Sequence, residues 1–486
     1  MKPLFKLAPL GFAIFGLSAL VGCQTGPKTV SLTEAKKITA TYVGKKIEQP
    51  PKNVTGLVEQ LKKYNGKGSA EEEKLQKIAL SEPSEEVQNN PPALMNFLFE
   101  RMRARKNLGM AAEALKDNRE LIPLVRKFNK DQTPRSSTSK ANMIYEAAYA
   151  ELMAGDFAVA MELAQEAFSY GHKPVSSYTQ YARFLLMQGR IEEAEEVLKQ
   201  LVDFTIKWQN DHHVPRLRGF IAQAKANYAD AEKWFGVAAD SMSRKQADWT
   251  YGAIMMSNRY RARNIARQGR IAEAELLTRA AIQAALKRYN SYQNQEMALH
   301  LVELARFRGQ GGDFQGVLEL TDVATEILDA FNYPKVAWLR YFIVKQKSMA
   351  YIALGDTDKA YALMKPVAEL FKREYATGYE SLFRQDLNRL FINAVVDPSD
   401  DDLEDIKVTL ETSVARLGDK HRRTALITAV EGVYHSRKGN HDAAIAAFDA
   451  AYKTLSSRSR QSKTEGESNF YAQKRKVLMA ESYLES

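Results

Sequence analysis

The sequence predicts an all-α fold in which pairs of helices stack into an α-solenoid. The first observation behind this prediction is repetition: the phrase QGRIEEAEEVL at Gln188–Leu198 returns as QGRIAEAELL at Gln268–Leu277. A chain that grows by stacking must repeat its contact surfaces, whereas an enzyme rarely repeats its active site. The second observation is composition. Ala, Glu, Leu, Lys, Arg and Gln dominate long segments, and no sustained alternation of β-branched residues predicts strands.

A small residue in each unit marks the end of the first helix and sets the repeat length. Glycine at this point permits the left-handed backbone that ends a helix. From the second of these residues onward the intervals are 34, 37, 43, 43 and 43 residues, and the last interval of 84 spans two units. The missing register falls on DPSDDDLED at 397–405, where Pro398 and a run of acids predict a helix start instead. The small residues are Gly109, Gly155, Gly189, Ala226, Gly269, Gly312, Gly355 and Gly439.

Each unit also carries small residues at three fixed positions, numbered 8, 20 and 27 within the repeat. Position 8 holds Ala148, Ala182, Gly219, Ala262, Ala305, Ser348 and Gly432. Position 20 holds Ala160, Ala194, Ala231, Ala274, Val317, Ala360 and Ala444. Position 27 holds Ala167, Leu201, Ala238, Ala281, Ala324, Val367 and Ala451. Gly, Ala or Ser fill 18 of these 21 positions, which indicates that two helices approach closely there.

This pattern resembles the tetratricopeptide repeat (TPR) family, whose helix–turn–helix unit has a 34-residue period and small residues at these positions. The resemblance implies tandem TPR-like helix pairs of 34 to 43 residues, about nine in all, wound into a right-handed superhelix. The units of 43 residues are more similar to the longer repeats of kinesin light chain, which predicts extended helices or loops. We expect the array to run from 84 to 457.

The N-terminus reads as a lipoprotein signal peptide over residues 1–22. Lys2 and Lys6 precede the apolar run LAPLGFAIFGLSAL, which is short for a membrane span. The run ends in LVGC, which resembles the bacterial lipoprotein box, and Cys23 is the only cysteine of the chain. The resemblance implies lipidation of Cys23 and, because Gln24 follows rather than Asp, a lipid-anchored position on the periplasmic face of the outer membrane. An ordinary secretory signal followed by a chance cysteine is the alternative.

The other segments are placed by their composition. Residues 23–31 form a lipidated tether, and residues 32–83 contain N-terminal helices expected at Leu32–Ile47, Val54–Tyr64 and Ala70–Leu80. Residues 458–486 are expected to contain a C-terminal capping helix at Glu467–Leu484, because terminal units need a polar outer face.

Nothing in the sequence predicts catalysis, a metal or a cofactor other than the covalent lipid. The formal charge of +10 over 486 residues is too mild to indicate a nucleic-acid partner. The pair His212-His213 makes a poor metal site because adjacent residues point to different helix faces, so we expect a solvated helix start. His441 beside Asp442 lies in a repeat turn, and DPSDDDLED lacks the spaced ligands of a calcium loop. The amino-acid sequences of the repeats also resemble units that precede CHAT-type protease domains, but no catalytic His–Cys pair follows here.

A basic track is expected on the inner side of the array. In the TPR family, positions 5, 9 and 12 of the first helix line the groove in which extended peptides lie. At these positions the sequence places six bases and no acid over five units, and an arginine fork can hold a carboxylate through two hydrogen bonds. We therefore expect an acidic segment or chain terminus of a partner protein to bind there; the alternative is a solvated basic face neutralised by Glu151, Glu193 or Glu303. The six residues are Arg183, Arg216, Arg259, Arg263, Arg306 and Lys345.

Together these features predict a non-enzymatic scaffold or adaptor that holds protein partners of the cell envelope and reaches the membrane through its lipid. Two alternatives remain. One is a regulatory or recognition subunit of a separate envelope enzyme, such as a peptidoglycan hydrolase or a CHAT-type protease. The other is a structural subunit of an envelope machine.

Overall fold

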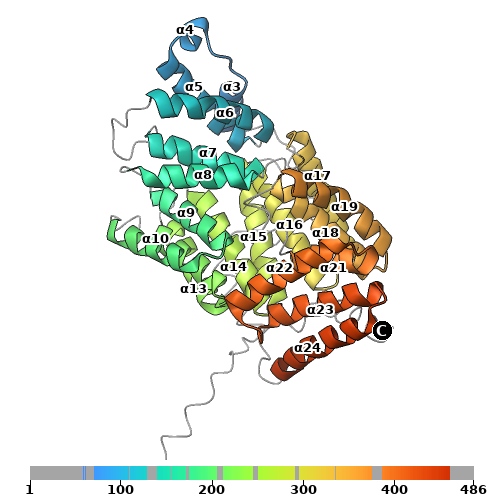
Figure 1. The fold of residues 1–486 in the computed structure, drawn as a ribbon. Coiled ribbons are helices and arrows are strands. Elements are labelled where there is room, and N and C mark those ends of the chain that lie inside the picture. The colour runs from blue at the N-terminus through green and yellow to red at the C-terminus, as the bar shows by residue number, and fades with distance from the viewer. Residues whose placement is uncertain are drawn as a thin grey trace, which may run out of the picture. The chain divides into compact units, whose positions relative to one another are not determined.

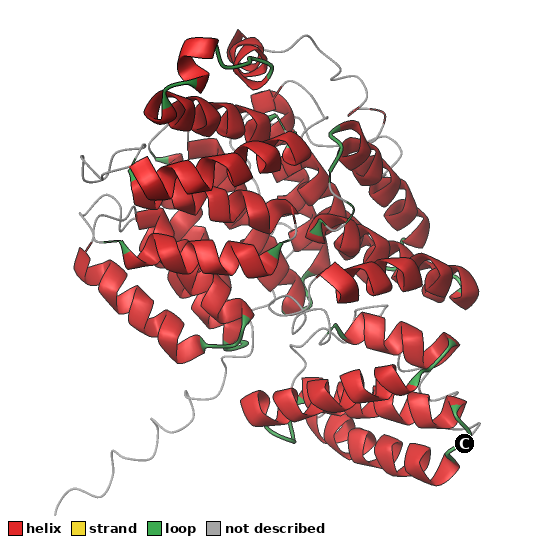
Figure 2. Ribbon diagram, turned by 45° about the horizontal axis from the view of Figure 1, so that its top comes forward, coloured by secondary structure: helices red, strands yellow, loops and turns green. Residues whose placement is uncertain are grey.

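The computed structural model describes residues 59, 61, 70–108, 110–128, 139–154, 156–170, 175–204, 212–244, 250–289, 295–333, 335, 337–374 and 386–459. All of them belong to the compact unit Lys46–Ser486. These residues form helices and no strand (Figures 1 and 2). The signal peptide, Cys23, the tether, the helix expected at Leu32–Ile47, most of that at Val54–Tyr64 and the C-terminal capping helix lie outside the described residues.

The described helices pack in consecutive pairs along the chain (Figure 1). The pairs are α5 with α6, α7 with α8, α9 with α10, α12 with α13, α14 with α15, α16 with α17, α18 with α19, and α23 with α24. The prediction of an all-α solenoid of helix pairs is confirmed. In chain order the helices are α3 (Ala70–Ala79), α4 (Glu85–Gln88), α5 (Pro91–Asn107), α6 (Ala111–Phe128), α7 (Lys140–Ala154), α8 (Phe157–Ser169), α9 (Val175–Met187), α10 (Ile191–Phe204), α12 (His213–Ala224), α13 (Tyr228–Ser243), α14 (Tyr251–Arg267), α15 (Ile271–Tyr289), α16 (Gln295–Gln310), α17 (Phe314–Ala330), α18 (Trp338–Ala353), α19 (Thr357–Glu374), α21 (Leu387–Val396), α22 (Asp400–Leu417), α23 (Arg422–Arg437) and α24 (His441–Ser459).

First helices of neighbouring pairs also contact one another. Such contacts join α5 to α7, α7 to α9, α9 to α12, α14 to α16, α16 to α18 and α18 to α21. A further contact joins α7 to α18, two first helices that lie far apart in the chain. The first helices therefore gather on one side of the stack.

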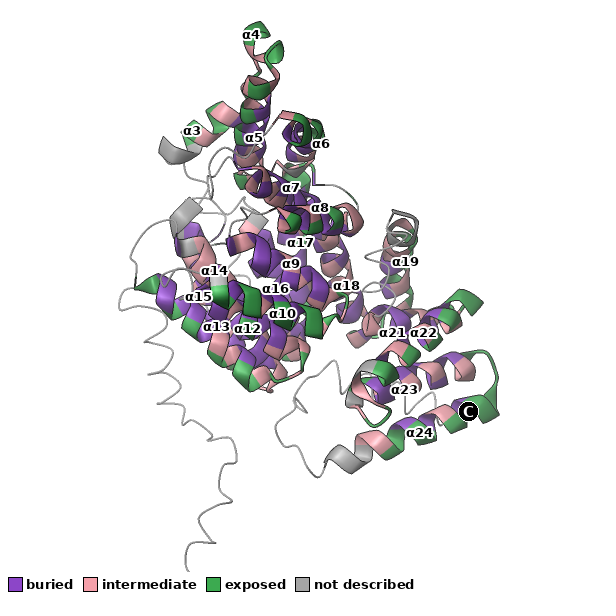
Figure 3. Cartoon of the chain, turned by 60° about the vertical axis from the view of Figure 1, so that its left-hand side comes forward, coloured by how far each residue is buried: buried purple, intermediate pink, exposed green. Residues whose placement is uncertain are grey.

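Buried residues run through the helices of the array (Figure 3), and the small residues predicted at the contact positions are among them. Among them, Val367 alone is only partly buried. Two glycines show why the residue must be small: a Cβ at Gly219 would lie 3.0 Å from Phe235, and one at Gly432 would lie 2.8 Å from Phe448. Each of these phenylalanines belongs to the second helix of the same pair, so the prediction of close helix approach is confirmed.

The turn between the two helices of a pair has the expected left-handed residue. Gly189, Gly269, Gly312, Gly355 and Gly439 all have positive φ angles, between 74° and 91°. In the unit where alanine replaces glycine, Ala226 adopts the same turn with a φ of 59°. Gly109 and Gly155 lie outside the described residues.

Part of the additional length in the units of 43 residues lies in longer helices, although α12 and α13, with 12 and 16 residues, are an exception. Helices α14 and α15 contain 17 and 19 residues, whereas α9 and α10 of the 37-residue unit contain 13 and 14. The irregular register at DPSDDDLED begins α22 as expected, with a capping box formed by Ser399 and Asp402.

Polar contacts between successive pairs recur at the spacing of the repeat. Lys106 pairs with Glu146 and Arg126 with Glu166, each 40 residues on. Asn264 donates to Gln223, 41 residues back, at 3.0 Å. Ion pairs of basic residues on the first helices show the same sequence separation, as described below. Side-chain contacts of this kind therefore link equivalent positions of neighbouring pairs.

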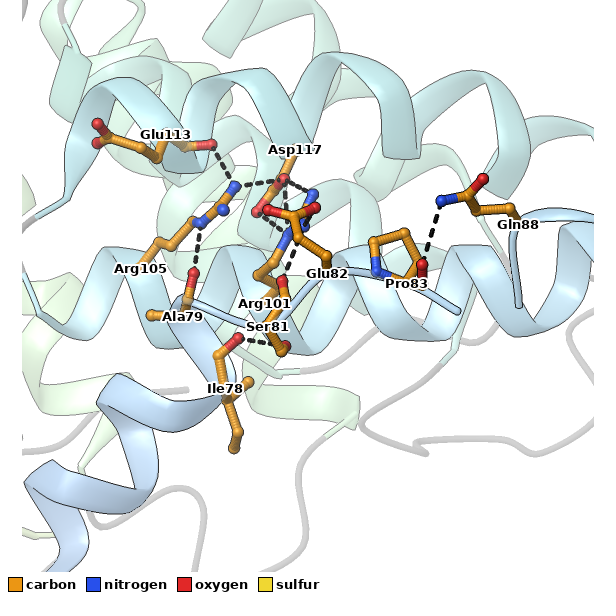
Figure 4. A network of polar contacts seen from close by, with 10 residues as sticks. All are labelled: Ile78, Ala79, Ser81, Glu82, Pro83, Gln88, Arg101, Arg105, Glu113 and Asp117. Atoms are coloured by element: carbon orange, nitrogen blue, oxygen red, sulfur yellow. Dashed lines mark hydrogen bonds and ion pairs between the residues drawn. The ribbon is translucent and has the colours of Figure 1, made fainter. Parts of the chain in front are cut away.

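The chain before the first pair is fastened to it by a buried network (Figure 4). Asp117 of α6 is 1% exposed and accepts hydrogen bonds from Arg101 at 2.8 Å and Arg105 at 2.7 Å, both from α5. The same two arginines donate to the backbone at the end of α3 and just beyond it: Arg105 Nε to the carbonyl of Ala79 at 2.9 Å, and Arg101 Nη1 to that of Ser81 at 3.0 Å. Helix α3 also packs against α5.

One detail of the sequence interpretation is wrong. His212-His213 does begin a helix, but the start is not solvated, because His212 is 2% exposed and its Nδ1 lies 3.3 Å from the carbonyl oxygen of Ala238. The second helix of that pair covers this end of α12. The two imidazole rings meet edge to face, with centroids 5.1 Å apart.

Candidate partner-binding face

The six predicted bases stand on five first helices of successive pairs, and we call them the basic row. Arg183 lies on α9, Arg216 on α12, Arg259 and Arg263 on α14, Arg306 on α16 and Lys345 on α18. None of them is fully exposed. Their surroundings divide the row into bases that already have an acid partner and bases that do not.

Three arginines of the basic row surround Tyr260. Arg183 Nη2 donates a hydrogen bond to the Tyr260 hydroxyl at 2.8 Å, and its guanidinium lies 4.9 Å from the centroid of the Phe220 ring. Arg259 and Arg263 lie 5.4 and 5.2 Å from the Tyr260 centroid. Burial alone would raise the pKa of the Tyr260 hydroxyl, but the surrounding arginines lower it to about 8. The phenol is therefore held in a strongly positive environment.

Arg216 and Arg259 have no acid within hydrogen-bonding distance among the described residues. Arg216 contacts His213 Nδ1 at 3.4 Å and Met256 Sδ at 3.6 Å, and burial lowers its pKa. Arg259 is 7% exposed, and its Nη1 approaches Glu296 no closer than 3.9 Å. The Nε atoms of both arginines are buried without a hydrogen-bond partner in the described part of the chain. Such donors cost free energy until they find an acceptor.

Arg263 and Lys345 are already neutralised. Arg263 pairs with Glu303 of α16, and Lys345 pairs with Asp386, the N-cap of α21. Burial would raise the pKa of Glu303, but Arg263 lowers it to about 2, so the pair is ionised. Lys345 likewise keeps the pKa of Asp386 below its ordinary value against the effect of burial. Both pairs join helices of successive units, 40 and 41 residues apart.

Arg306 makes no hydrogen bond or ion pair with the described residues. Burial lowers its pKa to about 10, and the positive charges of Arg267 and Arg263 act in the same direction. Arg267, which follows Arg263 by one helical turn, also has a pKa lowered by burial and lies 5.1 Å from the Tyr228 ring. This end of the row holds a partly desolvated positive charge.

Of the three acids expected to neutralise the basic row, Glu303 does so, and Glu151 and Glu193 have other partners. Glu303 pairs with the row through Arg263. Glu151 instead accepts from Asn118 at 3.0 Å, and burial raises its pKa. Glu193 pairs with Arg190 at the turn before α10.

Several residues of this face were missed by the sequence reasoning. His300 of α16 is completely buried, and burial together with Arg259 lowers its pKa to about 3, so the imidazole is neutral. Tyr260 carries no motif of its own. Its position directly after Arg259 is the only signal in the sequence that could have placed it beside the row.

Neither a metal site nor a membrane span is found in the part of the chain that the structure describes. No group of three or more His, Cys, Asp or Glu side chains there could hold a metal ion. No helix among the described residues is long and apolar enough to cross a bilayer.

Comparison with known proteins gives little beyond the fold. No protein-family model matches the sequence, and no curated protein matches it. Among solved structures, the crystal structure of the TPR domain of P58(IPK) aligns with 80% of this chain and 98% of that chain, at 13% sequence identity and a TM-score of 0.21. The structure of the chain itself shows an all-α array of consecutive helix pairs.

Proposed function

We propose that this protein is a non-enzymatic scaffold that holds a partner protein of the cell envelope against its basic row. The observation that supports this most directly is the division of the row. Arg263 and Lys345 form internal ion pairs, whereas Arg216 and Arg306 have no acid partner among the described residues. Arg259, on the first helix between them, has only Glu296 at 3.9 Å. An acidic segment or chain terminus laid across these helices supplies the missing acceptors.

The second part of the proposal is the cellular address. Lipidation at Cys23 anchors the chain to the periplasmic face of the outer membrane and keeps the array close to envelope partners. The support is the LVGC sequence after a short apolar run. Replacing Cys23 by Ser is expected to release the protein into the soluble periplasmic fraction. Membrane fractionation equal to that of the parent chain would refute lipid anchoring without affecting the binding proposal.

Binding is tested with the full-length chain and a fluorescent peptide of alternating Asp and Glu with a free C-terminal carboxylate. The variant Arg216→Gln/Arg306→Gln removes two bases that have no acid partner. We expect its affinity for the peptide to fall by tenfold or more in fluorescence anisotropy, because each charge-assisted hydrogen bond contributes about 1.5–3 kcal/mol.

The matched control is Arg103→Gln/Arg190→Gln, which removes the same charge from two arginines paired with Glu100 and Glu193 at the surface. This control is expected to bind the peptide like the parent chain. Equal affinity of all three proteins at matched ionic strength would contradict a role for the basic row. Arg263 is not a suitable target, since its loss would strand the buried carboxylate of Glu303.

A further inference from the structure

A group of arginines and tyrosines at one end of the basic row forms a more specific site than the row as a whole. It draws side chains from α7, α9, α12 and α14. We call it the arginine–tyrosine cluster, and it consists of Arg183, Arg216, Arg259, Tyr145, Tyr149 and Tyr260.

The members of the cluster lie close enough to act on one another. Burial lowers the pKa of Arg216, and the charge of Arg183 acts in the same direction. Arg183 on α9 and Arg216 on α12 both act on the hydroxyl of Tyr145 on α7. Arg183 and Arg259 act in the same way on Tyr149. The three guanidinium groups and the α7 tyrosines therefore share one electrostatic environment.

The charge of the cluster is not balanced by the described residues. Glu296 is the acid nearest to Arg259, at 3.9 Å, and no described acid is hydrogen-bonded to Arg183 or Arg216. His300 beside Glu296 is neutral, as shown above. When the neighbouring ion pairs Arg263–Glu303 and Lys106–Glu146 are counted as neutral, three guanidinium charges face one carboxylate, which leaves an excess of two positive charges. Like charges held together in a poorly solvated environment are unfavourable unless an anion joins them.

The donors of the cluster suit an acceptor with oxygens in several directions. Among the described residues, no hydrogen-bond partner is found for the buried N–H groups at Arg216 Nε on α12 and at Arg259 Nε and Nη1 on α14. The tyrosines of α7 stay protonated donors, because burial raises the pKa of Tyr145 to about 12 and raises that of Tyr149 further. A planar carboxylate carries one charge and offers its lone pairs in one plane. A tetrahedral phosphate carries between one and two negative charges near neutral pH, and its oxygens meet donors that arrive from different helices.

We propose that the arginine–tyrosine cluster binds a phosphate group as a dianion. The group comes either from free inorganic phosphate or from a phosphate monoester. This inference rests on the proposed role of the basic row as a binding face and names the chemistry that one end of it selects. Arg306, which lies further along the row on α16, is not part of the site.

The test uses the full-length chain and isothermal titration with inorganic phosphate, with glycerol phosphate as a monoester, and with chloride and succinate at matched ionic strength. We expect saturable phosphate binding, with succinate weaker by tenfold or more. Arg216→Gln is expected to weaken phosphate binding by at least tenfold, Arg216→Lys is expected to weaken it less, and Arg306→Gln is expected to leave it unchanged. Tighter binding of glycerol phosphate than of phosphate would identify the monoester as the source.

A stability readout separates this role from a merely structural one. Without phosphate, Arg216→Gln is expected to melt at or above the temperature of the parent chain, because it relieves repulsion with Arg183. Added phosphate is expected to raise the melting temperature of the parent chain more than that of Arg216→Gln, because the variant binds it more weakly. Phosphate binding no stronger than that of succinate, or unaltered in Arg216→Gln, overturns the inference. If the acidic peptide still binds and still depends on Arg306 in that case, the proposed function survives without the phosphate site.

Discussion

Arg183 of α9 donates a hydrogen bond to the hydroxyl of Tyr260 of α14 at 2.8 Å, across the helix pair that stands between them in the chain. The two residues are 77 positions apart, so the hydrogen bond spans two repeat units. This hydrogen bond therefore links the first helices of two pairs that are not consecutive in the chain.

Tyr260→Phe is expected to cost about 1–2 kcal/mol of unfolding free energy at pH 7, because the Arg183 donor loses its acceptor. The pKa of about 8 adds a pH signature. Between pH 8 and 10 the unfolded chain keeps a proton that the folded chain has lost, so the stability of the parent chain rises with pH in this window. Denaturant unfolding should show this rise, up to about 2–3 kcal/mol, in the parent chain and not in the variant.

Absorbance of tyrosinate at alkaline pH checks the same assignment independently. One tyrosine of the parent chain should ionise near pH 8, and that step should be missing in Tyr260→Phe. Identical titration curves for the two proteins would show that Tyr260 is not in a positive environment.

Arg263→Met is expected to destabilise the fold by about 3–5 kcal/mol, because it leaves the buried carboxylate of Glu303 without its partner. The double variant Arg263→Met/Glu303→Leu should recover most of this loss, since it removes both charges. Chemical unfolding of the single and double variants forms a double-mutant cycle. A double variant as unstable as Arg263→Met would mean that the ion pair is not the cause.

The same pair predicts acid sensitivity. The pKa of Glu303 is about 2 in the fold against an ordinary value of 4.5, so its contribution to stability is complete above pH 4.5 and is lost as the pH falls towards 2. Glu303→Gln should flatten this part of the stability curve. The comparison requires unfolding data at several acidic pH values for both proteins.

Ala226→Gly is expected to stabilise the protein by about 1 kcal/mol, because a left-handed φ of 59° strains alanine and suits glycine. The reciprocal change Gly269→Ala, at a φ of 84°, should destabilise the protein by a similar amount. Thermal unfolding of the two variants gives opposite shifts if the turn is the cause, and shifts of the same sign would contradict it.

Gly432→Ala is expected to cost about 1–3 kcal/mol, because the new methyl group would lie 2.8 Å from the Phe448 ring. Adding Phe448→Leu to this variant should restore part of the loss by making room for the methyl group. If Phe448→Leu lowers the stability of Gly432→Ala further, the contact between the two helices is not what requires glycine.

Much of the fold could be predicted from the sequence because the small residues at the contact between paired helices recur from unit to unit. The alanines at position 20 and the turn glycines follow from the repeat alone, and the structure buries the former and gives the latter positive φ. The burial of His212 could not be predicted, since it depends on how α13 lies over the start of α12.

The basic row was predictable as a set of positions but not as a set of charges. Whether Arg263 is free or paired depends on Glu303, which lies in the next unit and meets it only at one relative rotation of α14 and α16. Arg259, one turn earlier on the same helix, faces Glu296 at 3.9 Å and makes no hydrogen bond with it. A sequence pattern records spacing along each helix, but it does not record the rotation between two helices that decides such pairs.

The contact between α7 and α18 changes how the array should come apart. A linear stack frays from its ends, one unit after another, because each unit touches only the next. Here the units between α7 and α18 form a closed circuit, so opening any one of them also strains a junction elsewhere in the ring. Amide hydrogens in this circuit should exchange as a single cooperative block, while those of α3–α6 and α21–α24 exchange earlier and independently.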